Sequence, residues 1–375
     1  MRNIWIVLLA FSPLALHAQD KWDLRRCVDY AMKNNISVKQ ADVQARFAAL
    51  QLKQAQLNKI PTASFSTGVG GQFGRSIDPT SNQFTTSQFL YQNYQLQGGA
   101  PIYQFGRLKN AQIAADLNFQ ATQVDVQKTA NDVALNVASY YLQVLASNEQ
   151  IKIAEVQIAQ TREQYDNTKK RVDAGALPEL NLVELESQLA TDSSNLITAK
   201  TTLQQNILFL KALLNLDMAA DFDVAVPPVE SIPVEPIAEL QPEYVYGLAK
   251  ATQPEIKAAD LRIKSSEKSI LSNKASLRPS LNGFYSLGST YNNQAQDISG
   301  TSVINNYPIG QVNINGTSYQ VTSIQPYTNY TFKKTQYFKQ LNNNFQQAVG
   351  LSINVPIFSN GNARLSVENS KLNLL

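Results

Sequence analysis

The chain has almost none of the side chains on which enzymes and metal sites most often depend. Its 375 residues include one histidine and one cysteine. The histidine, His17, lies in the apolar N-terminal stretch, so removal of that stretch leaves no imidazole and only the thiol of Cys27. Ser-His-Asp and Cys-His catalysis, His-ligated metals and disulfides within one chain are therefore excluded. We expect a protein that is not an enzyme and needs no cofactor.

Long basic runs and long apolar runs are also missing. The net charge is only +3, so nucleic acid is not an expected partner. Residues 1–18 hold Arg2, an apolar run and a final Ala18, the pattern of a signal peptide that directs export. Beyond it no stretch of 18 apolar residues occurs, which predicts no transmembrane helix. An exported chain of this kind is either soluble in the periplasm or crosses an outer membrane as a closed β-barrel.

Helical periodicity dominates the middle of the chain. Apolar residues from Val126 to Ile158 recur at alternating spacings of 4 and 3, with one polar lapse at Ser147. The same rhythm resumes from Leu182 to Leu213, with polar lapses at Asp192 and Asn206. A neighbouring second apolar stripe indicates that the first helix packs against more than one partner.

A turn separates these two helices. The stretch RVDAGALPELN (171–181) contains Gly175, which suits a left-handed helix end, and Pro178, which suits the first turn of the next helix. The sequence therefore predicts a long antiparallel helical hairpin over residues 107–216, flanked by a shorter helical region at 22–58.

Four short stretches alternate between apolar and polar residues, as β-strands do. They are residues 62–71, 94–103, 280–288 and 347–358, and the polar segments between them, 72–92 and 289–346, are predicted to be loops. Strands of about ten residues suit a tilted crossing of a membrane. Because a barrel needs about eight strands, closure demands several chains, and three chains would supply about twelve.

The chain repeats its own plan. A shift of 218 aligns residues 31–42 with 249–260, and a Pro-Ile-aromatic-x-x-Gly motif occurs at both 101–106 and 356–361. We therefore predict a signal peptide (1–18), a first repeat (19–220), a Pro-rich connector (221–243) and a second repeat (244–375). Within the second repeat we predict a helix at 244–277 and the start of another at 362–375.

The second repeat is shorter than the first. Gly106 is followed by about 110 residues of helical hairpin, whereas 14 residues follow Gly361. We therefore expect a chain truncated before its second long helical hairpin. The predicted fold class is an α+β membrane protein with two internal repeats, in which a coiled-coil hairpin is joined to amphipathic strands of a shared barrel.

Three stretches carry a resemblance to a known family. They are LRRCVDYAMKNN (24–35), the paired Pro-Ile-aromatic motif, and RVDAGALPELNLVELESQLA (171–190). On these the chain resembles the outer membrane efflux proteins of the TolC family over essentially its whole mature length. The resemblance implies a homotrimer, with a twelve-stranded β-barrel in the outer membrane that continues into an α-helical tunnel in the periplasm.

The resemblance also implies a function and partners. Such a protein is a passive exit duct for small molecules or polypeptides in a tripartite efflux or type I secretion system. Its expected partners are a periplasmic adaptor (membrane fusion) protein, an inner-membrane RND or ABC transporter, and outer membrane lipid. The adaptor would dock on a tip formed by Arg171, Gly175, Ala176, Leu177, Pro178, Glu179 and Asn181. Asn181 stands where the family often has Asp, and the same turn can also be read as an ordinary helix connector.

A second group of candidate residues marks the passage from strand to helix. It consists of Pro101, Tyr103, Gly106, Pro356, Phe358 and Gly361. The two glycines are expected to free the backbone where a strand turns into a helix. Tyr103 and Phe358 are expected either to line a membrane interface or to pack within the junction.

Two other functions compete with the channel. A periplasmic adaptor-like coiled-coil protein would need no membrane crossing, but it predicts no amphipathic strands. An exported hydrolase would need a nucleophile motif, which is absent, and Glu179 and Glu186 on one helix face are best explained as a solvated surface.

Overall fold

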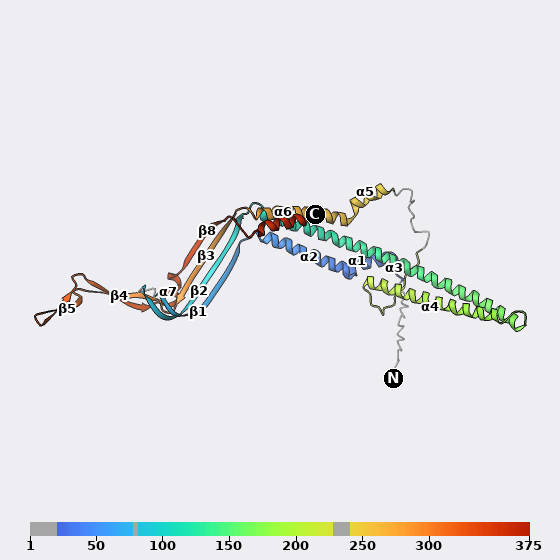
Figure 1. Cartoon of the computed structure of the whole chain (residues 1–375), viewed down its shortest axis with the longest axis horizontal. Coiled ribbons are helices and arrows are strands. Elements are labelled where there is room, and N and C mark those ends of the chain that lie inside the picture. Colours follow the sequence, from blue (N-terminus) through green and yellow to red (C-terminus); the bar gives the residue numbers. More distant parts are fainter. Residues whose placement is uncertain (1–20, 78–81, 228–240) are drawn as a thin grey trace, which may run out of the picture. The chain divides into compact units, whose positions relative to one another are not determined.

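The computed structural model describes residues 21–77, 82–227 and 241–375 (Figure 1). The predicted signal peptide and most of the Pro-rich connector lie outside the described residues. The chain forms two compact units. We call Met1–Leu52 with Ala114–Ser265 the helical unit, and Lys53–Ile113 with Ser266–Leu375 the sheet unit. In the described part of the chain, no helix combines the length and the apolar character needed to cross a bilayer.

A long helical hairpin forms most of the helical unit. Helix α3 (Arg107–Asp173) and helix α4 (Leu180–Leu214) run in opposite directions on either side of a short turn (Figure 1). These bounds agree with the hairpin predicted over 107–216. The shorter helices α1 (Leu24–Asn34) and α2 (Ile36–Leu57) precede it. Helix α1 is capped by Asp23, whose carboxylate accepts a hydrogen bond of 2.7 Å from the backbone N–H of Arg26.

The single helix predicted over 244–277 is wrong, because the structure divides it into two. Helix α5 (Pro242–Thr252) ends before Gln253, and helix α6 (Pro254–Ala275) begins with Pro254. A proline disfavours helical geometry in the residue before it, and Gln253 is accordingly extended, with φ −69° and ψ 123°. The same proline is well suited to the first position of a helix.

The core of the helical unit lies between α1, α3 and α4, next to the segments that contain Trp22 and Val224. Its largest fully buried side chains are Cys27, Val137, Tyr141, Val144, Leu210 and Leu214. Trp22 and Val224 form a short parallel β-bridge beside this core. The hydroxyl of Tyr141 donates to the carbonyl oxygens of Trp22, at 3.3 Å, and Ala225, so it ties this bridge to α3.

Four strands form one antiparallel sheet in the sheet unit. They are β1 (Thr62–Ile77), β2 (Phe84–Tyr103), β3 (Ser280–Asn292) and β8 (Gln346–Asn354), in the order β1-β2-β3-β8 (Figure 1). The prediction that these strands lie side by side in one sheet is confirmed. The prediction of a polar loop over 72–92 is wrong, since β1 and β2 extend through most of it. Their pairing continues without interruption from Thr62 with Gly99 to Ile77 with Phe84.

The segment predicted as a long polar loop, 289–346, also has regular structure. It contains two two-stranded antiparallel sheets, β4 paired with β7 and the hairpin β5–β6, and one short helix. Their bounds are β4 (Gln296–Ile304), β5 (Pro308–Ile314), β6 (Thr317–Thr322), β7 (Tyr327–Lys334) and α7 (Tyr337–Asn343). Asn315 and Gly316 form the turn between β5 and β6, both with positive φ. An Asn-Gly pair between alternating strands is a strong hairpin signal that the sequence interpretation missed. The last helix, α8 (Asn362–Leu372), begins where predicted.

Burial makes Cys27 a test of the helical core. The Cys27 side chain is fully buried, and burial, aided by the nearby charge of Asp23, raises the pKa of its thiol to about 12. Because only the thiolate reacts quickly, we expect Cys27 of the folded protein to resist maleimide labelling at neutral pH. Labelling should become complete in denaturant, as followed by mass spectrometry. Rapid labelling of the folded protein would show that α1 does not pack against α3 and α4.

Candidate functional site

The four-stranded sheet has one apolar and one polar face. Residues that are directly opposite each other in neighbouring strands share a face. Pairing of Phe65 with Leu96, Leu96 with Leu287 and Val349 with Tyr285 therefore defines one surface. We call it the apolar face, formed by Phe65, Val69, Phe73, Leu96, Leu281, Leu287, Val349, Leu351 and Ile353. Many of these side chains are exposed to an extent that is unusual for apolar residues, with Val349 87% and Val69 74% exposed.

The opposite surface of the sheet is polar. We call it the polar face, formed by Ser64, Ser66, Asn93, Gln95, Gln97, Asn282, Ser286, Ser352 and Asn354. Its aromatic residues lie over glycines. For example, a Cβ at Gly350 would stand 2.7 Å from the ring of Phe284. Arg75, on the other face, is the only charged residue within the four described strands. The polar face is therefore hydrophilic without carrying a fixed charge.

The sheet has two open edges. Within the described residues, β1 pairs only with β2, and β8 pairs only with β3. Because every pair in the sheet is antiparallel, the two edge strands β1 and β8 run in opposite directions. The β8 edge of one copy can therefore continue into the β1 edge of another copy with the same antiparallel pattern. Exposed edges of this length need such a partner.

The two predicted junctions have the same backbone geometry. After β2, Gly106 has a φ of 81°, and Arg107 donates to the carbonyl of Gln104 at 2.9 Å. Before α8, Gly361 has a φ of 77°, and Asn362 donates to the carbonyl of Ser359 at 2.9 Å. The equivalent atoms are separated by 255 residues in both cases. Glycine suits both positions because its positive φ brings no steric cost.

Each junction also contains a second left-handed residue that the sequence interpretation missed. Phe105 has a φ of 48° and Asn360 a φ of 50°. Asparagine adopts this conformation readily, whereas phenylalanine rarely does. Phe105 is held by its neighbours: its ring centroid lies 4.9 Å from that of Tyr103, and the guanidinium of Arg278 lies 5.5 Å from it. Two consecutive residues with positive φ therefore precede the helix at each junction.

The remaining junction residues differ between the two copies. Pro101 and Tyr103 belong to β2, where a β-bulge between them interrupts the pairing with β3. Pro356 and Phe358 were predicted to lie in a strand, and this is wrong, because β8 ends at Asn354. Pairing stops there because Asn354 is opposite Ser280, the first residue of β3. Tyr103 packs against Phe105 within its junction yet is 55% exposed, whereas Phe358 is 83% exposed.

The tip of the hairpin is a well-defined turn. The N–H of Ala176 donates to the carbonyl of Arg171 and that of Gly175 to the carbonyl of Val172, both at 2.8 Å, and Gly175 has a φ of 70°. This is a Schellman motif, which satisfies the last carbonyls of α3. Helix α4 begins at Leu180, so Pro178 lies just before its first turn rather than within it. All the predicted tip residues are exposed apart from Leu177, which is half-buried: Arg171, Gly175, Ala176, Pro178, Glu179 and Asn181.

The polar lapses of the two helices face each other across the hairpin. The amide of Asn206 donates to the hydroxyl of Ser147 at 2.9 Å. The hydroxyl of Thr161 donates to the Asp192 carboxylate at 2.7 Å, and Thr161 and Asp192 are 2% and 4% exposed. The amide of Gln188 donates to the second oxygen of this carboxylate at 2.8 Å. Thr161 continues the predicted seam three residues after Ile158, but its pairing could not be seen without the partner helix.

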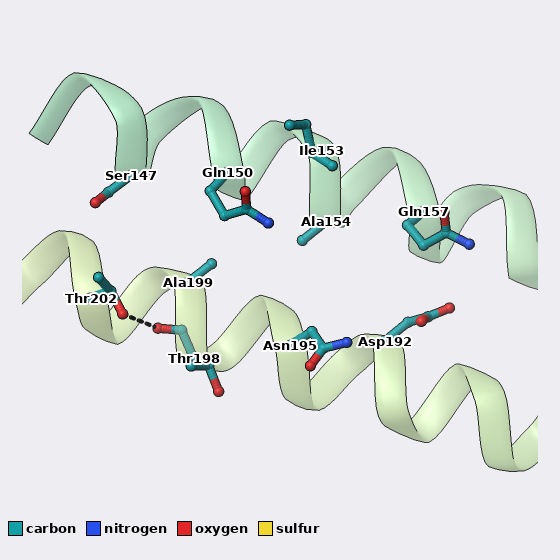
Figure 2. A pocket seen from close by; sticks show the side chains of 10 residues that line it. All are labelled: Ser147, Gln150, Ile153, Ala154, Gln157, Asp192, Asn195, Thr198, Ala199 and Thr202. Carbon is teal, nitrogen blue, oxygen red and sulfur yellow. Dashed lines mark hydrogen bonds between the residues drawn. The ribbon is translucent and has the colours of Figure 1, made fainter. Parts of the chain in front are cut away.

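Between these two polar pairs the hairpin has a cavity of about 390 Å³. Figure 2 shows Ala154 and Ala199 pointing toward one another from α3 and α4, so small side chains leave the space open. Its lining is otherwise mainly polar: Ser147, Gln150, Ile153, Gln157, Asp192, Asn195, Thr198 and Thr202. In the described residues, no cluster of His, Cys, Asp and Glu has an arrangement that could hold a metal ion.

A sheet with one apolar and one polar face, joined by tight turns to a long helical hairpin, is the architecture of an outer membrane channel. Comparisons with known proteins agree. The family model described as "Outer membrane efflux protein" matches residues 28–216. The pyoverdine export outer membrane protein OpmQ of Pseudomonas putida is 24% identical over 293 residues, which cover 72% of this chain and 59% of OpmQ.

Solved structures share the fold. The CmeC outer membrane channel of Campylobacter jejuni has a TM-score of 0.69 at 17% identity, with 94% of this chain and 65% of CmeC covered. A membrane protein from Pseudomonas aeruginosa has a TM-score of 0.71 at 17% identity, with 94% of this chain and 70% of that protein covered.

The chain belongs to the outer membrane efflux protein family, the TolC family. This is a family of transport channels located in the cell outer membrane, with their helical part in the periplasm. The chain spans between 53% and 62% of the length of the three curated relatives it matches.

The buried Thr161–Asp192 contact should be a major determinant of hairpin stability. Replacing Thr161 with Val keeps the shape of the side chain but leaves the buried carboxylate without one donor. We expect the free energy of unfolding of the helical unit to fall by about 1–3 kcal/mol. Urea denaturation followed by far-ultraviolet circular dichroism measures this loss.

Thr198→Val is the matched control, because Thr198 is exposed and its hydroxyl bonds only to the backbone of its own helix. Its effect should stay within about 0.5 kcal/mol. Equal losses for the two variants would contradict the role assigned to the Asp192 contact.

Proposed function

We propose that this chain forms the outer membrane channel of a tripartite efflux or type I secretion system, a passive exit duct for small molecules or polypeptides. The two-faced sheet with open antiparallel edges is the observation that carries the proposal. Its apolar face suits lipid and its polar face suits an aqueous lumen. A closed barrel is required because a sheet edge in lipid would leave backbone groups without hydrogen-bond partners.

The same edges support a homotrimer. Four strands per chain cannot close a barrel, whereas three chains give twelve strands, which exceeds the practical minimum of about eight. The opposite directions of β1 and β8 allow each junction between chains to be antiparallel. The two similar halves of each chain, each with strands followed by a left-handed turn and a helix, fit the predicted internal repeat.

The helical hairpin would form part of the periplasmic tunnel wall, with the tip as the docking point for a periplasmic adaptor. The exposed side chains of Arg171, Glu179 and Asn181 lie on a turn whose backbone is fixed by the Schellman motif. Such a turn presents polar groups in a constant geometry. Energy for transport would come from an RND or ABC transporter in the inner membrane.

The competing hypothesis is a periplasmic adaptor-like protein. Such a protein does not cross a membrane, so it would not require the exposed apolar face of the sheet.

The uncharged polar face bears on how cargo passes. A duct lined by Ser, Asn, Gln and Gly offers hydrogen bonds but no fixed charge to hold an ion of either sign. Cargo of either charge would therefore pass this part of the wall without strong binding, which suits an exit route whose selectivity is set by its partners.

Two neighbouring residues of β8 test the membrane assignment. Leu351 lies on the apolar face and Ser352 on the polar face. A lysine at a lipid-facing site near the bilayer midplane costs about 2–4 kcal/mol, whereas a lumen-facing lysine meets water. We expect Leu351→Lys to deplete the protein from the outer membrane fraction and Ser352→Lys to leave its amount there unchanged.

Heat-sensitive migration as a trimer in detergent gels provides the second readout for both variants. Ser352→Lys should still give the trimer, and Leu351→Lys should give mainly monomer. If both variants, or neither, reached the outer membrane as trimers, the assignment of the two faces would be wrong.

A further inference from the structure

Helix α7 takes the place of a strand beside the C-terminal end of β3 (Figure 1). Pairing between β3 and β8 stops at Gly288 with Gln346, but β3 continues to Asn292. Along these last residues, side chains of α7 and of Asn344 just after it make hydrogen bonds to β3 instead. The side-chain amide of Gln340 bonds to both the N–H and the carbonyl of Asn292, each at 2.9 Å. The amide of Asn344 donates to the carbonyl of Thr290 at 2.7 Å.

The contacts of Tyr337 place α7 on the apolar face. Its hydroxyl is 2.6 Å from the hydroxyl of Tyr94 and donates to the Gln92 side chain at 2.9 Å. Its ring centroid lies 4.7 Å from that of Tyr291. Tyr291 is directly opposite Gln92, and Gln92 is directly opposite Val69, a residue of the apolar face. The helix therefore lies outside the proposed lumen.

Helix α7 buries a polar side chain and exposes an apolar one, the reverse of a helix on a surface in water. Gln340, which points to the sheet, is 2% exposed, whereas Phe338 is 81% exposed. A helix on an aqueous surface buries its apolar residues and exposes its polar ones. Exposure of a phenylalanine next to a buried glutamine suits surroundings that are themselves apolar.

The distance along the sheet from Tyr103 to helix α7 matches the thickness of the apolar band of a membrane. Tyr103 is opposite Leu281 at the N-terminal end of β3, and Tyr291 lies ten residues after Leu281 in the same strand. At ~3.3 Å per residue and a tilt of ~45°, the two levels are about 23 Å apart, close to the ~25 Å apolar band of outer membrane barrels. Tyr94, Tyr291 and Tyr337 thus form a cluster of rings with hydroxyl groups, the residue type that is enriched at membrane interfaces.

We propose that α7 is a membrane-interface anchor, in which Phe338 enters the boundary between lipid headgroups and acyl chains while Tyr337 and Gln340 hold the helix to the sheet. This inference rests on the proposed function, because it requires the apolar face to lie in lipid. Insertion of the Phe338 ring fixes the depth of the sheet in the bilayer at the end of the sheet that lies beside α7. The two-stranded sheets β4–β7 and β5–β6 then begin just outside the membrane surface.

Spin labelling of the full chain in phosphatidylcholine vesicles tests the anchor. Cysteines at Phe338, Val349 and Ile324, one per variant, are labelled with a nitroxide, and the native Cys27 stays unlabelled because it is buried. All three sites are at least 81% exposed, so labels there should not disturb the fold. Collision rates with oxygen, which concentrates in lipid, and with a water-soluble nickel chelate report the depth of each label.

Val349 represents the apolar face and Ile324 the hairpins beyond it, between β6 and β7. We expect the ratio of oxygen to nickel accessibility to be highest at Val349, lowest at Ile324, and several-fold higher at Phe338 than at Ile324. A helix that only completed the edge of β3 would leave Phe338 in water. A ratio at Phe338 equal to that at Ile324, with Val349 in lipid, would overturn the anchor alone. Water exposure of Val349 as well would overturn the proposed function together with the anchor.

Discussion

The backbone hydrogen bonds at the two open edges of the sheet are the constraint on which the rest of this structure depends. A strand in lipid has no water to satisfy its N–H and carbonyl groups, so every edge must be paired. In this chain β1 and β8 run in opposite directions, which makes them complementary. This complementarity allows several chains to close one barrel, as the proposed trimer requires. In the proposed barrel, the alternation of apolar and polar residues decides which side of the wall meets lipid and which meets the lumen.

The helical hairpin solves a different problem, the choice of one register between two long helices. Apolar seams with a regular repeat can slide by one heptad at little cost, whereas a misplaced buried carboxylate is expensive. The Thr161–Asp192 and Ser147–Asn206 contacts therefore select a single alignment of α3 and α4. The Schellman turn at Gly175 fixes the end of the hairpin in the same register.

Much of this architecture could be predicted from local sequence patterns. Heptad spacing located α3 and α4, alternation located the four strands of the sheet, and the paired motif located the left-handed turns at Gly106 and Gly361. Features set by distant contacts could not be predicted. The ring of Phe105, a residue with positive φ, packs against Tyr103 and Arg278, and α7 lies beside the part of β3 that β8 leaves unpaired. The adaptor-docking role of the tip and the internal repeat stay predictions, since both depend on partners or ancestry rather than on contacts within this chain.

Pairing between β1 of one chain and β8 of the next is the central claim, and disulfide trapping measures it directly. A cysteine at Thr67, on the side of β1 that carries Phe65 and Val69, is combined in turn with a cysteine at Gln347, Val349, Leu351, Ile353 or Ser352. The account predicts disulfides between chains for one or two of the odd-numbered β8 positions and none for Ser352. The cross-linked species should contain two or three chains and no more. Absence of such disulfides at every odd-numbered position in outer membranes, or a disulfide formed within one chain, would contradict it.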